Sequence, residues 1–167
     1  IKTAHGKKDV YGDAVVITTG GISYPLTGST GDGYRIARDF GLDVSAPEAS
    51  LVPIVTVEDT SPMMGLALKN AVFTVKDGGG KKVFSEQGEI LFTHFGISGP
   101  LALSASAHMR PDPAAYSAEI DMKCALDGQT LDRRILSDLS ESPAKALINS
   151  LGALLPSSII AEVVRRS

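Results

Sequence analysis

The sequence predicts a mixed α+β fold with a βα segment first, a β-rich domain second and a helical part at the C-terminus. Three observations lead to this prediction. An apolar run, Asp13–Thr19, passes through a glycine-rich loop into an amphipathic helix. The middle of the chain alternates apolar and polar residues around hairpin turns. From Thr130 onward, apolar residues recur at helical spacing. We therefore expect domains over residues 1–46, 47–126 and 127–167.

The first elements predicted are a hairpin and a buried strand. Ile1–Ala4 and Lys8–Tyr11 have the pattern of two short strands that turn at His5 and Gly6. The run Asp13–Thr19 is short, apolar and rich in β-branched residues. This composition is typical of a strand buried on both faces of a parallel sheet.

A helix is expected over Asp32–Phe40, where apolar side chains recur at helical spacing. Thr30 is a suitable N-cap, and Gly41 is a suitable stop. Strand, glycine loop and helix together make half of a βαβ unit. The composition then changes, which places a domain boundary near Ser45–Ser50.

The middle of the chain predicts β-structure. Ala71–Lys76 and Lys82–Ser85 flank the turn Asp77–Gly80, which is a hairpin signal. The elements expected next, in chain order, are a strand over Glu89–Thr93, a helix over Pro100–Met109 and a strand over Tyr116–Lys123. Helices are expected in the remainder of the chain.

The glycine-rich loop, residues 18–33, reads TTGGISYPLTGSTGDG. It contains neither G-x-G-x-x-G nor a Lys-Ser/Thr ending, so it does not match a phosphate loop. Hydroxyls and backbone N–H groups at a helix start attract anions, but the Asp32 carboxylate would repel a phosphate. Asp32 therefore either accepts hydrogen bonds from neutral donors, such as a sugar hydroxyl, or caps the helix. Gly20 and Gly21 either admit a ligand closely or make a tight turn.

A second motif, residues 88–100, reads GEILFTHFGISGP and contains His94 between two phenylalanines. The His94 imidazole is a candidate proton donor or polar ligand group in an apolar pocket. The alternative is a half-buried histidine bonded to a backbone carbonyl. The three histidines have no metal-ligand spacing, so no metal site is predicted.

Composition limits the partners that we expect. The net charge is −3, which argues against a nucleic-acid groove. The single cysteine, Cys124, excludes an intramolecular disulfide and fits a reducing compartment. No apolar run approaches the roughly 18 residues that a membrane span needs. We therefore expect a cytoplasmic protein with no nucleic-acid or membrane partner. The sequence does not predict an oligomeric state.

Two of these stretches carry a resemblance to a known family. DAVVITTGG, residues 13–21, resembles the strand and ATGG segment of flavoproteins with two dinucleotide-binding domains, with Thr18 where alanine is usual. SYPLTGSTGDGYRIARDFG, residues 23–41, and SEQGEILFTHFGISGP, residues 85–100, resemble the bacterial YhiN/BaiN-like NAD(P)/FAD-dependent oxidoreductases, which include aminoacetone oxidase.

This resemblance implies a partial Rossmann-like βα segment, the C-terminal portion of an FAD-binding unit, over residues 1–46. It implies a β-rich, barrel-like insert domain over residues 47–126 and a helical part of that insert over residues 127–167. His94 would be catalytic, with Thr93, Gly96, Ser98 and Gly99 facing the flavin. The residues that would bind FAD are Thr19, Gly20, Gly21, Ser23, Tyr24, Pro25, Thr30, Gly31 and Asp32.

The family's N-terminal G-x-G-x-x-G, which holds the FAD pyrophosphate, is missing from this sequence. Both ends of the chain look cut from something longer. We therefore expect a fragment of an FAD-dependent oxidoreductase that binds FAD weakly or not at all and has no activity alone. The parent would use NAD(P)H as reductant on an unknown small-molecule substrate. The alternative is a non-catalytic module that binds a ligand or partner.

Overall fold

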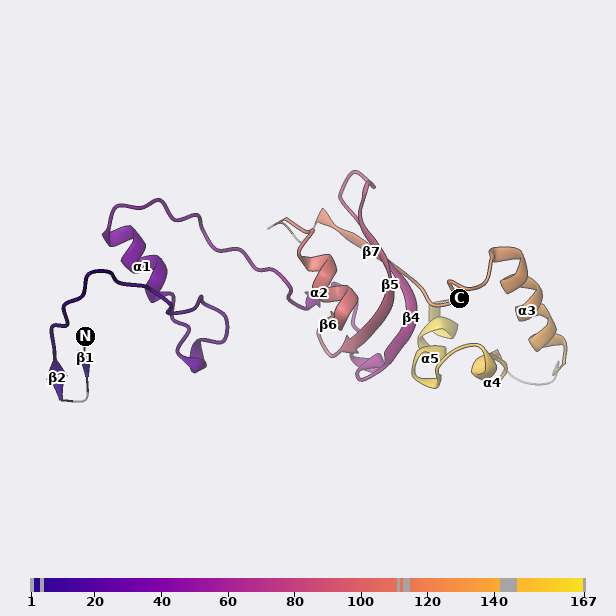
Figure 1. Ribbon diagram of the computed structural model, residues 1–167. Coiled ribbons are helices and arrows are strands. Elements are labelled where there is room, and N and C mark those ends of the chain that lie inside the picture. Colours follow the sequence, from indigo (N-terminus) through magenta and orange to yellow (C-terminus); the bar gives the residue numbers. More distant parts are fainter. Residues whose placement is uncertain (1, 4, 111, 113–114, 142–146, 167) are drawn as a thin grey trace. The chain divides into compact units, whose positions relative to one another are not determined.

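The computed structural model describes residues 2–3, 5–110, 112, 115–141 and 147–166 (Figure 1). The chain separates into two compact units, Ile1–Pro47 and Glu48–Ser167, each of which is described by itself. The mixed α+β class is confirmed: helices and an antiparallel sheet occur in succession along the chain. The predicted three-domain division stays a prediction.

The first unit contains a small hairpin, β1 (Lys2–Thr3) and β2 (Gly6–Lys7), which pair antiparallel. Ile1 and Ala4 of the predicted hairpin lie outside the described residues. The predicted buried strand Asp13–Thr19 is wrong for this structure, because it forms no strand and Val15 is 83% exposed. A strand needs a hydrogen-bonded neighbour, and no strand among the described residues pairs with this run.

Helix α1 (Asp32–Asp39) confirms the helix predicted after the glycine loop. Its N-cap is Gly31, not Thr30 as predicted. Gly31 has a φ of 79°, a left-handed conformation that glycine adopts at little cost. The residue before the helix therefore serves to turn the backbone, and it does not supply a side-chain oxygen. A short 3₁₀ turn, η1 (Pro25–Thr27), precedes it in the loop.

The second unit is built on a curled five-stranded antiparallel sheet in the order β3-β6-β5-β4-β7 (Figure 1). Its strands are β3 (Ile54–Val55), β4 (Ala67–Lys76), β5 (Lys82–Thr93), β6 (Gly96–Ser98) and β7 (Ser117–Asp121). The β4–β5 hairpin and β7 confirm predicted elements. The separate strand expected over Glu89–Thr93 is wrong, because it continues β5 without a turn. Gly88, directly before it, pairs with Ala71 of β4.

Side chains alternate in burial along β4, and its inward residues form the core. Phe73, Val75 and Ile90 are fully buried. Helix α2 (Pro100–Ser106) covers this face with Leu101, which packs against the backbone at Gly88. A Cβ at Gly88 would lie 3.2 Å from the Leu101 side chain, so glycine allows this close approach.

Helix α2 ends at Ser106, before the predicted end at Met109. The Ser106 hydroxyl donates to the Leu103 carbonyl at 2.7 Å and accepts from the Val52 N–H at 2.9 Å. These bonds tie the last turn of the helix to the segment that enters β3. Pro111 and Pro113, which follow the predicted helix in the sequence, lie outside the described residues.

The C-terminal part is helical, as predicted. It contains α3 (Gly128–Ser140), α4 (Leu147–Ser150), the 3₁₀ turn η4 (Leu151–Ala153) and α5 (Ser157–Arg166). The Asp127 carboxylate caps α3 by accepting the Thr130 N–H at 2.8 Å, and this bond lowers the pKa of Asp127. Ile159 of α5 belongs to the hydrophobic core that α5 shares with the sheet.

Candidate functional site

The glycine loop of the first unit folds back on itself around the start of α1. The Gly31 N–H donates to the Gly21 carbonyl at 3.1 Å. A Cβ at Gly33 would lie 2.8 Å from the Thr19 Oγ1, and one at Gly20 would lie 3.4 Å from the Ser29 Oγ. The structure therefore brings the predicted residues Thr19, Gly20 and Gly21 against Gly31 and the first turn of the helix.

Other predicted loop residues lie further out. Ser23, Tyr24 and Pro25 are exposed, and Tyr24 has 82% of its surface accessible. Tyr24 has a φ of 52°, a strained conformation for a non-glycine residue. Its carbonyl accepts from the Thr27 N–H at 2.9 Å and from the Thr27 Oγ1 at 2.7 Å, which holds this turn. These residues are not drawn into the contact between Gly21 and Gly31, and Thr30 is also exposed.

The charged side chains of the loop limit the chemical groups that it can bind. Residues 18–33 contain no basic side chain. Asp32 pairs with Arg35 at 3.3 Å, and Arg35 also reaches Asp39 at 3.3 Å. The guanidinium in the first turns of the helix is therefore engaged by two carboxylates. Exposed backbone and the Asp32 carboxylate can accept hydrogen bonds from hydroxyl groups, whereas the loop has no basic side chain to hold a phosphate.

In the second unit, His94 occupies a two-residue turn between β5 and β6. The turn is fixed by hydrogen bonds around Thr93: its Oγ1 donates to the Gly96 carbonyl at 3.0 Å, and its own carbonyl accepts from the Thr60 Oγ1 at 2.8 Å. The His94 ring is exposed and meets the Phe95 ring edge-on, with centroids 4.9 Å apart. Within the described part of the chain, the His94 ring has no hydrogen-bond partner, so the half-buried alternative is wrong.

Gly96 is the reason that β3 can approach this turn. A Cβ at Gly96 would lie 2.1 Å from the Ile54 carbonyl oxygen, so any other residue would displace β3. The Thr56 N–H donates to the Phe95 carbonyl at 3.2 Å beside this contact. Ser98, which closes β6, is half-buried, and Gly99 caps α2 with a φ of 89°.

Exposed apolar residues lie on the segments next to the His94 turn. Val55 and Val57 lie on the segment bonded to the turn, with 73% and 101% of their surfaces accessible. Met64 is 64% exposed, and the next residue donates its N–H to the Phe92 carbonyl. We call Val55, Val57, Met64, His94 and Phe95 the sheet tip. The loop that contains Val57 also carries two exposed acidic residues, Glu58 and Asp59.

Sequence reasoning missed the part that Thr60 plays in this site. Its hydroxyl lies 2.8 Å from the Thr93 carbonyl and 3.3 Å from that of Gly96, and the residue is buried. Thr60 lies 33 residues before Thr93, outside both motifs, so no local pattern indicates the contact.

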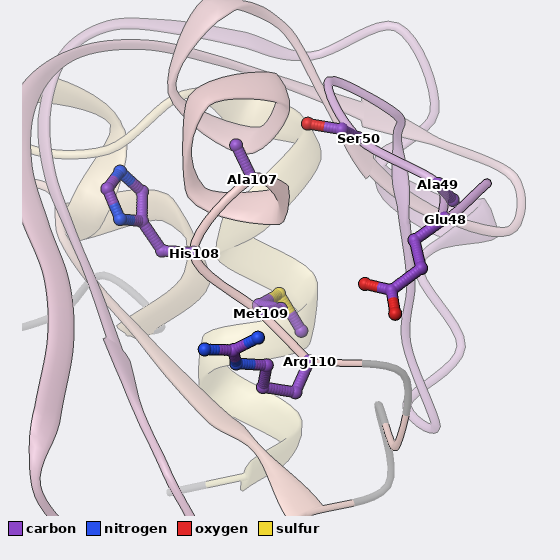
Figure 2. Close-up of a pocket in the computed structure, with 7 residues that line it drawn as sticks. All are labelled: Glu48, Ala49, Ser50, Ala107, His108, Met109 and Arg110. Atoms are coloured by element: carbon purple, nitrogen blue, oxygen red, sulfur yellow. The ribbon is translucent and has the colours of Figure 1, made fainter. Parts of the chain in front are cut away.

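The second unit also contains a hollow of about 410 Å³ beside the end of α2 (Figure 2). It is lined by Glu48, Ala49, Ser50, Ala107, His108, Met109 and Arg110. The His108 ring points away from Glu48 in Figure 2 and packs 5.6 Å from the Phe84 ring. None of the predicted site residues lines this hollow. Across the described ranges, no three potential ligands from histidine, cysteine and the acidic residues are grouped to hold a metal ion.

Comparisons with known proteins identify a family and two curated relatives. Residues 48–167 match the family described as HI0933-like protein barrel and H2TH domain. The chain is 34% identical over 146 residues to a Haemophilus influenzae protein named ribosomal RNA dihydrouridine synthase, with 87% of this chain and 34% of the relative covered. It is 32% identical over 155 residues to an Escherichia coli protein of the same name, with 89% of this chain and 35% of the relative covered.

The chain thus spans about a third of the length of these curated relatives. No helix in the described ranges has the length and apolar character needed to cross a membrane. The curled sheet and the C-terminal helices are the parts to which the family description refers. The chain belongs to the HI0933-like family, and residues 48–167 are its barrel and H2TH domain.

Proposed function

We propose that this chain contributes the barrel, the helical part and a cofactor-contacting loop to a flavin-dependent enzyme that reduces uridine in ribosomal RNA. The observation that carries the proposal is the 34% and 32% identity to two proteins named ribosomal RNA dihydrouridine synthase. Dihydrouridine differs from uridine by two hydrogens across the C5–C6 bond of the base. The reaction therefore needs a hydride donor and a proton donor.

Reduced FAD, when bound, supplies the hydride. The backbone of Thr19, Gly20 and Gly21 lies beside the cofactor in this proposal, and the Asp32 carboxylate accepts from a hydroxyl group of FAD. The remaining cofactor contacts predicted from the family, at Ser23, Tyr24, Pro25, Thr30 and Gly31, belong to the same proposal. The glycine loop has no basic side chain for the pyrophosphate, so residues 1–167 alone bind FAD weakly in this proposal. NAD(P)H regenerates the reduced flavin, and the enzyme works in the cytoplasm.

His94 is the proton donor in this proposal. Its ring is exposed on a turn that Thr60 and Thr93 hold in place, so the imidazole is presented on a fixed backbone. The apolar side chains of the sheet tip, Phe95 and Val55 among them, exclude water from the base as the proton is delivered. General acid catalysis by a positioned side chain contributes about 10²- to 10⁴-fold.

The test uses the intact gene product with ribosomal RNA and NADPH or NADH. Mass spectrometry of RNA digests should show uridine gaining two hydrogens. The variant His94→Gln should lower kcat by about 10²-fold or more with little change in KM. His5→Gln is the matched control and should keep full activity. A His94→Gln enzyme with unchanged kcat would remove the imidazole from the reaction, and a wild-type enzyme without product would refute the RNA proposal.

A second candidate is oxidation or reduction of a small molecule by the same flavin-dependent scaffold. The observation that favours it is the excess of 19 acidic over 16 basic residues, which does not attract a polyanion. The two candidates differ in a direct measurement. A small-molecule enzyme would turn over NAD(P)H with a soluble acceptor and leave RNA unmodified, and it would not bind RNA in the presence of physiological salt.

A further inference from the structure

A groove lies between the sheet and the helical part of the second unit. It has a volume of about 290 Å³. It is lined by Ala67, Leu68, Lys69, Asn70, Met122, Lys123, Leu155 and Pro156. None of the sheet tip residues lines it, so it is separate from the site described above. Its walls come from three elements: the start of β4, the segment after β7 and the segment before α5.

An irregularity in β4 exposes the polar side of this groove. The pairing of β4 with β5 changes register between Leu68 and Ala71, so Lys69 and Asn70 have no partner of their own in β5. Leu68 is buried, and both residues of the irregularity are exposed. Bulges of this kind re-aim side chains out of the regular alternation. The irregularity therefore places two successive polar residues, Lys69 and Asn70, at the groove. A regular strand would point successive side chains to opposite faces of the sheet.

The charge of the groove is positive. Two of its residues are lysines, and no carboxylate lines it. Neither the Lys69 nor the Lys123 ammonium pairs with a carboxylate among the described residues, whereas Lys76 further along β4 pairs with Glu119. The nearby Asp121 uses its Oδ1 to accept the Lys123 backbone N–H at 2.8 Å. Two lysines thus line a hollow that no carboxylate lines, in a chain whose net charge is −3.

Asn70 connects the irregularity to the neighbouring segments. Its Oδ1 accepts from the Gln87 Nε2 at 2.7 Å, which fixes the orientation of the side chain. The Asn70 carbonyl accepts from the Cys124 Sγ at 3.7 Å, so the segment after β7 is attached to the irregularity. Two lysines and an apolar floor that includes Leu155 suit a phosphate group with a sugar or base next to it.

We propose that this groove binds a backbone phosphate of the RNA substrate, with Lys69 and Lys123 as the charged contacts. The inference rests on the proposed function, because the relatives' names are what make RNA the polyanion in question. The groove positions the RNA and does not select a base, since phosphate contacts carry no sequence information. The net charge of −3 is compatible with phosphate contacts from two lysines, but it argues against a broad basic surface for RNA.

The test measures binding of a fluorescent ribosomal RNA fragment to the intact gene product over a range of potassium chloride concentrations. The double variant Lys69→Gln/Lys123→Gln removes the two charges of the groove. Lys81→Gln/Lys82→Gln is the matched control, because it removes the same charge from the exposed turn residue Lys81 and the exposed first residue of β5. None of these four lysines is buried, so the variants are expected to fold, and circular dichroism checks this.

Each phosphate contact adds about 0.7 to 0.9 to the magnitude of the slope of log K against log salt concentration. The groove variant should therefore lose about 0.7 to 0.9 from that slope, because one phosphate contact is removed, with Kd rising about fivefold or more at low salt. The control should change the slope by less than about 0.5. Equal slopes for the groove variant and the control would overturn the inference while leaving the proposed function intact.

Two further outcomes separate the alternatives. A wild-type protein that does not bind the RNA fragment would overturn both the inference and the proposed function. Inorganic phosphate at matched ionic strength should weaken RNA binding no more than chloride does. Strong competition by inorganic phosphate in the wild type, absent from the groove variant, would assign the groove to a free phosphate ligand and overturn the RNA assignment.

Discussion

The substitution Gly96→Ala tests how the sheet tip is held together. A Cβ at this position would lie 2.1 Å from the Ile54 carbonyl oxygen, 2.9 Å from the Thr56 nitrogen and 3.0 Å from the Val55 Cα. All three atoms are backbone, so no side chain can rotate away. Gly96 also has a φ of 151°, which an L-residue rarely adopts. The new methyl group must therefore displace β3.

The size of the displacement follows from these distances. Cβ atoms do not approach other heavy atoms closer than 3.0 Å, so the Ile54 oxygen must move by about 0.9 Å. The Thr56–Phe95 hydrogen bond, now 3.2 Å long, would stretch to as much as about 4.1 Å and break. The Ile54–Ile97 pairing next to it would also be lost. Two or three lost bonds and the backbone strain cost about 3 to 4 kcal/mol together.

Urea denaturation followed by circular dichroism measures this cost. The control is Gly80→Ala, because Gly80 has a φ of 80° but no atom within 4 Å of the position that its new Cβ would occupy. Strain alone should cost the control about 1 to 2 kcal/mol. We expect Gly96→Ala to lose at least about 1.5 kcal/mol more than the control. Equal losses would refute the reasoning, because they would show that β3 does not constrain the turn.

Three further substitutions test the core, a helix cap and the glycine loop. Phe73→Ala should cost about 3 to 5 kcal/mol in urea denaturation because the ring is fully buried, whereas Phe73→Leu should cost much less; similar values would contradict close packing at this position. The Thr130 N–H lowers the pKa of Asp127 in the folded state below the ordinary value of 3.8. The ionised Asp127 carboxylate therefore stabilises the fold above pH 3.8, and this stabilisation is lost as the pH falls through the folded-state pKa. The Tm difference between wild type and Asp127→Asn should therefore shrink between pH 7 and about pH 2.5, and a constant difference would count against the cap. Gly33→Ala should speed hydrogen exchange of the amide that bonds Gly21, because its Cβ would lie 2.8 Å from the Thr19 Oγ1, and adding Thr19→Ala should restore protection; a double variant that exchanges as fast as Gly33→Ala would show another cause.

The elements that the sequence predicts well are those specified by local pattern. The β4–β5 hairpin follows from alternation around Asp77–Gly80, where the Asp77 side chain accepts the Gly79 and Lys81 N–H groups. The helix after the glycine loop follows from its apolar periodicity and its closing glycine. In both cases the residues that specify the element lie within it.

The elements that the sequence predicts poorly depend on distant partners. Asp13–Thr19 has the composition of a buried strand, but a strand forms only beside a neighbour, and composition does not reveal whether one is present. The break expected before Glu89 is absent because Gly88 pairs across to Ala71 and continues β5. The support of His94 by Thr60 crosses 33 residues, so neither motif contains it.

The place of β3 in the sheet has a consequence for the order in which the protein folds. The strands β4, β5 and β6 follow one another along the chain and pair through short connections, so their contacts form early at a small cost in loop entropy. Strand β3 pairs with β6 across a sequence separation of 43 residues, from Ile54 to Ile97, and it contributes only two residues. Strand β7 pairs with β4 over a similar separation, 41 residues from Lys76 to Ser117. We expect both outer strands to dock after β4, β5 and β6 have paired. The surface around His94 would then assemble late and open early.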